Sequence, residues 1–168
     1  MQSSDLVFPE ETKEMYKALN QQLASLVEGE PLVLPNLSNA ASLLAAALEY
    51  INWAGFYLMH EGQLILGPFM GNPACIRINM GSGVCGTAAE KDEAQVVADV
   101  KTFPGYIACD GSTLSEIVIP IHYKGTVVGV LDIDSPQKRR FGKNDLEGLS
   151  EFVKILEDSC DWAAFKVG

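Results

Sequence analysis

Apolar residues recur at three- and four-residue steps in the first part of the chain, which is the spacing of amphipathic helices. The first predicted helix spans about residues 10–28, with Glu10 and Glu11 in the turn where the helix dipole favours acidic side chains. Its apolar side contains Met15, Leu19, Leu23, Leu26 and Val27. A second helix is predicted from about Ser38 to Tyr50, with Ser38 or Asn39 as its N-terminal cap.

The spacing of apolar residues then changes to two, which is typical of strands. The predicted strands are residues 53–59, 63–69, 76–78, 96–98, 116–123 and 126–134. Lys124-Gly125 is the predicted turn between the last two, which form the clearest hairpin in the sequence. Residues 101–114 hold proline, glycine and short polar side chains without a period, so we expect a loop there.

A last amphipathic segment predicts a C-terminal helix over about residues 144–163. Asn144 is its predicted cap, and Glu147 stands at the capping-box position three residues later. The order of elements is two helices, several strands and a final helix, within a chain of 168 residues. This order predicts one α+β domain in which helices pack on a single antiparallel sheet.

Acidic residues outnumber basic residues by 22 to 12, which gives a net charge of −10. Such a charge repels nucleic-acid phosphates and anionic membranes, so we expect neither as a partner. No run of about 18 apolar residues is present to span a membrane, and residues 1–11 lack the basic and apolar regions of a signal peptide. We therefore expect a cytoplasmic protein, in which cysteines stay reduced and serve catalysis, metal binding or packing.

Two carboxylates lie in the hydrophobic segment LDID, residues 131–134. Alternate residues of a strand share a face, so Asp132 and Asp134 point one way, and Glu116 begins the partner strand of the same hairpin. One interpretation is a carboxylate cluster that binds an ammonium group and donates a proton, because buried carboxylates need a cation or a proton. The other is a strand at the sheet edge, with solvated acids that cap the turn at 135–136. The pattern leaves both open.

The glycine-rich segment GSGVCG, residues 81–86, precedes a helix-like stretch but lacks the Lys-Ser/Thr ending of a phosphate-binding loop. Its glycines are better explained by backbone passing close to a pocket. His60 and His122 are interpreted as surface residues beside hairpin strands, and they form no evident dyad with a cysteine.

The four cysteines are Cys75, Cys85, Cys109 and Cys160, and their spacing matches no zinc finger or zinc ribbon, so we expect no metal. Cys109 lies in the predicted loop, where a thiol is accessible, although the neighbouring Asp110 disfavours a thiolate. Cys160 continues the apolar side of the last helix and is predicted to be part of the core.

Several segments together resemble the free methionine-(R)-sulfoxide reductases, a family built on a single GAF domain. They are NWAGFYL (52–58), LGPFMGNPACIRI (66–78), GSGVCGTAA (81–89), IACDGSTLSEIV (107–118) and VVGVLDIDSP (127–136). The resemblance covers about residues 38–156. It implies a GAF domain over residues 1–168, with a six-stranded antiparallel sheet between helices and the N-terminal helix packed with the C-terminal helix. It also implies reduction of free methionine-(R)-sulfoxide to methionine, with no bound cofactor.

The same resemblance implies roles for three cysteines. Cys109 is the attacking thiol, Cys75 the resolving thiol and Cys85 an auxiliary resolving thiol. Attack on the sulfoxide leaves a sulfenic acid on the enzyme, and condensation with a second thiol gives a disulfide. An external reductant, thioredoxin, then recycles the enzyme.

Five further residues acquire roles in the same way. Glu116, Asp132 and Asp134 bind the α-ammonium group, and Glu116 or Asp134 supplies the proton. Trp53 and Tyr57 lie four apart on a strand and hold the methyl-thio end, although core packing would equally explain two aromatic residues there. The oligomeric state stays open, with a homodimer as one option.

Two other function classes compete with the enzyme. One is a non-catalytic GAF module that senses a small molecule, although sensor modules usually share a chain with an output domain. The other is a redox sensor that forms a disulfide from Cys109 with Cys75 or Cys85 and needs no carboxylate cluster.

Overall fold

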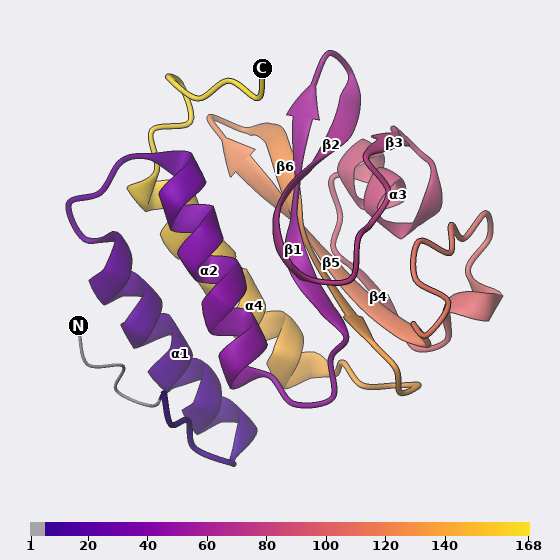
Figure 1. Ribbon diagram of the computed structural model, residues 1–168, viewed down its shortest axis with the longest axis horizontal. Helices are drawn as coiled ribbons and strands as arrows, with labels where there is room; N and C mark the ends of the chain where they lie inside the picture. Colours follow the sequence, from indigo (N-terminus) through magenta and orange to yellow (C-terminus); the bar gives the residue numbers. More distant parts are fainter. Residues whose placement is uncertain (1–5) are drawn as a thin grey trace.

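The computed structural model describes residues 6–168, which form one six-stranded antiparallel sheet and four α-helices (Figure 1). The helices are α1 (Thr12–Val27), α2 (Val33–Ala47), α3 (Gly83–Lys91) and α4 (Lys143–Ser159), and the strands are β1 (Trp53–His60), β2 (Gln63–Gly71), β3 (Arg77–Asn79), β4 (Gln95–Val97), β5 (Ser115–Tyr123) and β6 (Thr126–Ser135). The strand order is β3-β2-β1-β6-β5-β4. This confirms the predicted α+β class and the antiparallel sheet. Residues 1–5, part of the segment in which no signal peptide was expected, lie outside the described range.

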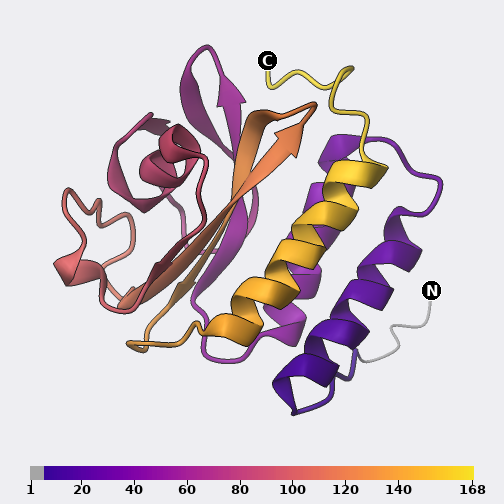
Figure 2. The same ribbon diagram turned by 180° about the vertical axis from the view of Figure 1, so that it is seen from behind.

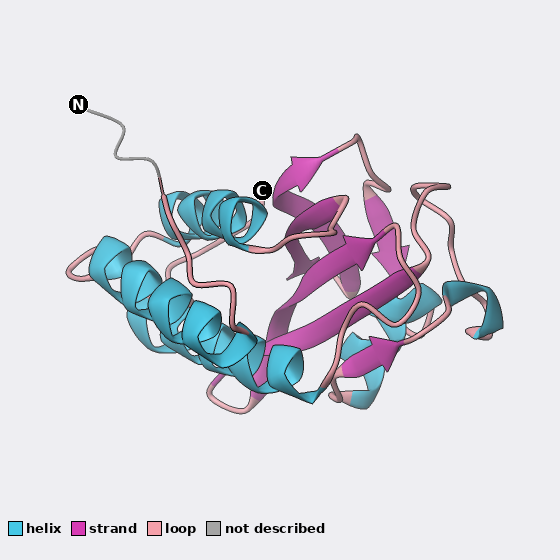
Figure 3. Cartoon of the chain, turned by 90° about the horizontal axis from the view of Figure 1, so that it is seen from below, coloured by secondary structure: helices cyan, strands magenta, loops and turns pink. Residues whose placement is uncertain are grey.

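Helices α2 and α4 pack on one face of the sheet and α1 packs against both of them, whereas the other face carries α3 and the loops. Figure 2 shows α4 lying across the sheet beside α1, and Figure 3 shows the long helices together on one side. Leu131 and Ile133 of β6 pack into the helical core, whereas Val130 belongs to a second core beneath α3. The alternation of side chains along β6 therefore separates two apolar layers.

Helices α1 and α4 approach closely at Gly148. A Cβ atom at this position would lie 2.2 Å from the ring of Tyr16, so only glycine allows this contact. The Tyr16 hydroxyl donates a hydrogen bond to Asp145 Oδ1 at 2.7 Å, and Asn20 Nδ2 donates to the Gly148 carbonyl at 3.1 Å. The two ends of the chain are thus joined by buried polar contacts as well as by apolar packing.

The boundaries of α2 differ from the prediction. The helix begins at Val33, five residues before the predicted Ser38, because proline is tolerated in a first turn and Pro35 does not stop it. Ser38 is not a cap, since its hydroxyl donates to the Leu34 carbonyl at 2.8 Å inside the helix. The helix ends at Ala47, before Tyr50, whose φ of 58° is incompatible with a right-handed helix.

The capping prediction for α4 was also wrong. The cap is Gly142, whose backbone N–H donates to Asp145 Oδ2 at 2.8 Å, so the acidic partner is Asp145 instead of Glu147. The helix ends at Ser159, four residues before the predicted 163. In α1, Leu26 was predicted on the buried side, yet its side chain is 41% exposed.

The other boundaries shift by a few residues. The short strands β3 and β4 each move by one residue from the predicted 76–78 and 96–98. The predicted loop at 101–114 begins within a short 3₁₀ turn, Val100–Thr102, and is otherwise irregular as expected. None of the helices in residues 6–168 is both long and apolar enough to cross a membrane.

Candidate active site

A pocket lies on the face of the sheet opposite to α1, α2 and α4. Strands β1, β5 and β6 form its floor, α3 forms one wall, and the loops before β3 and before β5 form its mouth. Its lining residues are Trp53, Tyr57, Pro73, Ala74, Ile78, Ser82, Gly83, Val84, Cys85, Tyr106, Ile107, Cys109, Asp110, Glu116, Asp132 and Asp134. Seven of the eight residues predicted for the site are in this set, and the eighth, Cys75, is bonded through a disulfide to Cys109 of the set, so the fold brings them together. The cavity measures about 40 Å³.

The three predicted carboxylates lie on adjacent central strands. Glu116 of β5 is directly opposite Asp134 of β6, which is in turn opposite Trp53 of β1. Glu116 and Asp132 are 6% and 5% exposed. Because β6 lies between β1 and β5, the alternative of solvated acids on an edge strand is wrong.

Two carboxylate oxygens of the cluster lack a hydrogen-bond partner. Across residues 6–168, no protein group pairs with Oδ1 of Asp132 or with Oδ1 of Asp134, although both atoms are shielded from solvent. A buried oxygen without a partner costs free energy comparable to a lost hydrogen bond. The cluster therefore retains two acceptors that a group entering the pocket can satisfy.

Burial is the main cause of the shifted pKa values in the cluster. It raises the pKa of Glu116 and of Asp134, and the negative charge of Asp132 raises both further. Burial also raises the pKa of Asp132, while hydrogen bonds from Glu116 and Cys85 act in the opposite direction. Burial therefore favours the protonated forms of these carboxyl groups, whereas a bound cation would favour their ionised forms.

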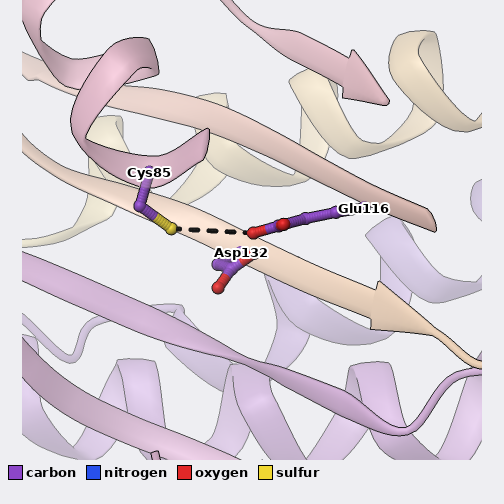
Figure 4. Close-up of side chains that lie close together, drawn as sticks. All are labelled: Cys85, Glu116 and Asp132. Carbon is purple, nitrogen blue, oxygen red and sulfur yellow. Dashed lines mark hydrogen bonds between the residues drawn. The ribbon is translucent and has the colours of Figure 1, made fainter. Parts of the chain in front are cut away.

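Cys85 stands over the carboxylates from the start of α3 (Figure 4). Its Sγ atom is 3.9 Å from Glu116 Oε1, to which it donates a weak hydrogen bond, and Asp132 lies beside them. Burial, followed by the charges of Asp132 and Glu116, raises the pKa of the thiol. The fold therefore keeps Cys85 as a neutral thiol in the absence of a cation.

Gly86 allows α3 to approach β3 closely. A Cβ atom on Gly86 would lie 2.4 Å from the Asn79 carbonyl oxygen, so a larger residue would push the helix away from β3. The glycine-rich segment thus allows a close backbone approach beside the pocket, in agreement with its interpretation from sequence.

Cys75 and Cys109 form a disulfide at the mouth of the pocket, with Cα atoms 5.6 Å apart. Cys75 precedes β3 and Cys109 precedes β5, and each is partly exposed. The Tyr57 hydroxyl donates to the Cys75 carbonyl at 2.9 Å, which fixes one loop to β1. Two loops at the same side of the sheet thus bring the two sulfur atoms into one bond.

Asp110 connects the two loops and lines the pocket, although it was not among the residues predicted for the site. Its Oδ2 atom accepts hydrogen bonds from Asn72 Nδ2 and Asn52 Nδ2, both at 3.3 Å. Its Oδ1 atom accepts from the Ser112 backbone N–H and hydroxyl at 2.9 and 2.6 Å. These bonds, led by those from Ser112, lower the pKa of Asp110. The carboxylate thus serves as an acceptor for both loops.

An aromatic wall lines the pocket beside the carboxylates. The ring centroid of Trp53 lies 5.9 Å from that of Tyr57 and 5.2 Å from that of Phe69, in stacked arrangements. Trp53 Nε1 donates to the Asn72 carbonyl at 3.1 Å. Trp53 and Tyr57 are buried core residues that also line the pocket, so core packing and a position in the pocket are compatible.

The remaining cysteine and the histidines lie away from the pocket. Cys160 is buried in the helical core, as predicted, and its Sγ atom accepts a hydrogen bond from Asn36 Nδ2 at 3.5 Å. His122, predicted to be a surface residue, is only partly exposed and contacts both Asp92 and Glu157. The spacing of these residues along the chain gave no signal for that contact.

The comparisons with known proteins agree with this geometry. The sequence model of the GAF domain matches residues 40–157. The chain is 47% identical over 144 residues to the free methionine-R-sulfoxide reductase of Escherichia coli, covering 86% of this chain and 87% of that protein. It is 45% identical over 156 residues to the enzyme of the same name from Saccharomyces cerevisiae, covering 88% and 87%. A substrate complex of fRMsr from Staphylococcus aureus superposes with a TM-score of 0.83 at 51% identity, covering 86% of this chain and 94% of that one.

Proposed function

The chain belongs to the GAF-domain family of free methionine-(R)-sulfoxide reductases, and on that premise we propose that it reduces free methionine-(R)-sulfoxide with its own cysteines. The observation that carries the proposal is the position of the Cys75–Cys109 disulfide at the mouth of a pocket floored by unpaired carboxylates. A thiol pair supplies two electrons, and the carboxylates supply charge and protons. A free amino acid sulfoxide needs both.

We assign substrate recognition to the carboxylate cluster. The α-ammonium group of a free amino acid is a cation that can donate to the unpaired oxygens of Asp132 and Asp134. A peptide-bound sulfoxide has no such cation and would leave the buried carboxylates unpaired, which a polar site rejects strongly. The aromatic wall of Trp53 and Tyr57 suits the methyl-thio end.

We assign the chemical step to Cys109. Its thiolate attacks the sulfoxide sulfur, a carboxylic acid protonates the sulfoxide oxygen, and the oxygen ends on Cys109 as a sulfenic acid while methionine leaves. Glu116 or Asp134 is the proton donor in this assignment, because burial raises the pKa of both carboxyl groups and favours their protonated forms.

Resolution and recycling follow from the disulfide. The thiol of Cys75 displaces water from the sulfenic acid of Cys109, forming the observed bond, and Cys85 is an auxiliary thiol. An external dithiol, which we take to be thioredoxin in the cytoplasm, then reduces the disulfide. The proposed chemistry uses no bound cofactor, and it would proceed equally in a monomer or a homodimer. We treat residues 1–168 as a single GAF domain.

The test is NADPH consumption in the presence of thioredoxin and thioredoxin reductase. We expect turnover with the free R sulfoxide and little with the S sulfoxide or with N-acetyl methionine sulfoxide. Equal rates on the free and the N-acetylated compounds would contradict ammonium recognition.

A thiol redox sensor would also form the Cys75–Cys109 bond, but it would release no methionine. Chromatographic measurement of methionine after one turnover separates the enzyme from a sensor, and from a GAF module that only binds the sulfoxide.

A further inference from the structure

We propose that Cys85, Glu116 and Asp132 form a site for a thiophilic divalent cation such as Zn²⁺, which excludes the substrate while it is bound. The exclusion rests on the proposed function, because the same carboxylates are assigned to the substrate ammonium group. Binding of the cation itself rests on the geometry alone.

The three donor atoms already lie close enough together to bind one metal ion. One sulfur atom and two carboxylate oxygens, from α3, β5 and β6, all lie within 4.8 Å of one another. Sγ of Cys85 and Oε1 of Glu116 are 3.9 Å apart. In a tetrahedral zinc site, a sulfur and an oxygen ligand are about 3.6 Å apart, given the usual bond lengths. Small side-chain rotations therefore suffice to bring these two donors to that separation.

A second observation points to a missing cation. Oδ1 of Asp132 is buried and has no hydrogen-bond partner anywhere in the described range 6–168, although the side chain belongs to the pocket. No lysine, arginine or histidine of that range lines the pocket to compensate the carboxylates. The cavity of about 40 Å³ exceeds the roughly 10–15 Å³ that one water occupies, so an ion and a water ligand fit.

The donor set determines which cation binds. Thiolate and carboxylate ligands together suit Zn²⁺ and Co²⁺, whereas Mg²⁺ and Ca²⁺ require six or more oxygen ligands. Binding must release the Cys85 proton, because only the thiolate is a ligand. Because this proton is released, the affinity for metal should increase with pH. The spacing of the cysteines did not indicate this site, because its three donors come from three separate elements of the fold.

The disulfide allows a clean experiment. In the oxidised protein Cys75 and Cys109 are unavailable as ligands, so a thiolate–metal bond must come from Cys85 or from the buried Cys160. Co²⁺ is added to the oxidised protein, and the thiolate-to-cobalt charge-transfer band is measured. Zn²⁺ affinity is measured by competition with a chromophoric chelator. We expect one Zn²⁺ per chain and a cobalt band that Zn²⁺ abolishes.

Matched variants decide the location of the metal. Cys85→Ser should abolish the cobalt band and weaken Zn²⁺ binding at least about 10-fold, the usual effect of losing a ligand or its support. Asp132→Asn should weaken Zn²⁺ binding similarly while retaining the thiol, and Cys160→Ser should leave both measurements unchanged. A cobalt band or Zn²⁺ affinity that is unchanged in Cys85→Ser and Asp132→Asn would overturn the proposal, as would the absence of a band in the oxidised wild-type protein.

These readouts require no catalysis, so they are independent of whether the chain reduces methionine sulfoxide. The competition is also measured in the oxidised protein, where Zn²⁺ should weaken the binding of free methionine-(R)-sulfoxide measured by calorimetry. Sulfoxide binding that is unchanged at saturating Zn²⁺ would overturn the exclusion of substrate.

Discussion

Asp110 Oδ2 accepts a hydrogen bond from Asn72 Nδ2 at 3.3 Å, so the residue next to Cys109 binds the loop that carries Cys75. The two thiols are 34 residues apart in sequence, and this contact reduces the freedom of one loop relative to the other. Holding two reacting groups in place is among the largest contributions to the rate of a reaction between them. Asp110 is therefore a positioning residue for formation of the disulfide.

Asp110→Ala should slow disulfide formation about 10-fold while leaving the methionine released in a single turnover nearly unchanged, because only the second step needs both loops. Thiol loss and methionine release are followed by rapid quenching. Asp110→Asn, which keeps one acceptor oxygen, should recover part of the rate. Asp158→Ala, an exposed acid on α4, is the matched control. Equal slowing of both steps would contradict a role confined to positioning.

The two cysteines of the disulfide should differ in single-turnover behaviour. Cys109→Ser should release no methionine, since the attacking thiol is lost. Cys75→Ser should release close to one equivalent and then fail in thioredoxin-supported cycling, because the sulfenic acid is not resolved efficiently. Methionine released per enzyme is measured in both variants. The opposite pattern would reverse the assigned roles.

Glu116→Gln and Asp134→Asn should lower kcat/KM by roughly 10²-fold or more, the scale of losing a general acid or a charged contact. Their melting temperatures should stay level or rise, because an amide removes repulsion between neighbouring carboxylates. Steady-state kinetics and thermal unfolding are compared with Glu61→Gln, a change at an exposed turn. Early unfolding with normal activity in the folded fraction would instead make the acids structural.

The carboxylate cluster should make stability depend on pH. Burial raises the folded-state pKa of Glu116 and Asp134 above their unfolded values of about 4. The folded protein then binds more protons than the unfolded chain, so this stabilisation is complete below pH of about 4 and is lost as pH rises through the folded-state pKa. The free energy of unfolding of oxidised, ligand-free protein is measured by urea titration across this range. Glu116→Gln should reduce the decrease in unfolding free energy with rising pH. Glu151→Gln, at an exposed position on α4, should leave that decrease unchanged.

The disulfide should stabilise the folded protein. It closes a loop of 34 residues, for which the chain-entropy relation gives roughly 3–4 kcal/mol. Urea unfolding with and without reductant should show this difference for the wild-type chain. Cys75→Ser should unfold at the same urea concentration under both conditions. A reductant effect that persists in Cys75→Ser would assign the stabilisation to another cause.

Local patterns predicted the sheet well. The two-residue period placed all six strands to within a few residues, and the alternation in LDID correctly put Asp132 and Asp134 on the face opposite to Leu131 and Ile133. Both results depend only on the geometry of a single strand or hairpin. The short segments of the resemblance also contain all eight residues predicted for the site, seven of which line the pocket.

Contacts between distant segments were not predictable in this way. The Cys85–Glu116 hydrogen bond spans 31 residues and the Asn72–Asp110 bond spans 38, and neither leaves a period in the sequence. Helix ends failed for a different reason. The predicted caps at Ser38 and Asn144 lie after Pro35 and Gly142, but a proline in the first turn and a glycine at the cap are compatible with helices that begin earlier.

The sheet separates the pocket from the helical core, and this separation affects how the amino-acid sequence can evolve. The side chains that react lie on one face, whereas most large apolar contacts, including those of Leu131 and Ile133, lie on the other. Substitutions that repack the helical layer can therefore accumulate without altering the pocket, and surplus stability gained there can compensate for costly changes around the carboxylates. The architecture thus permits new substrate preferences to be selected, or engineered, on one face while the other maintains the fold.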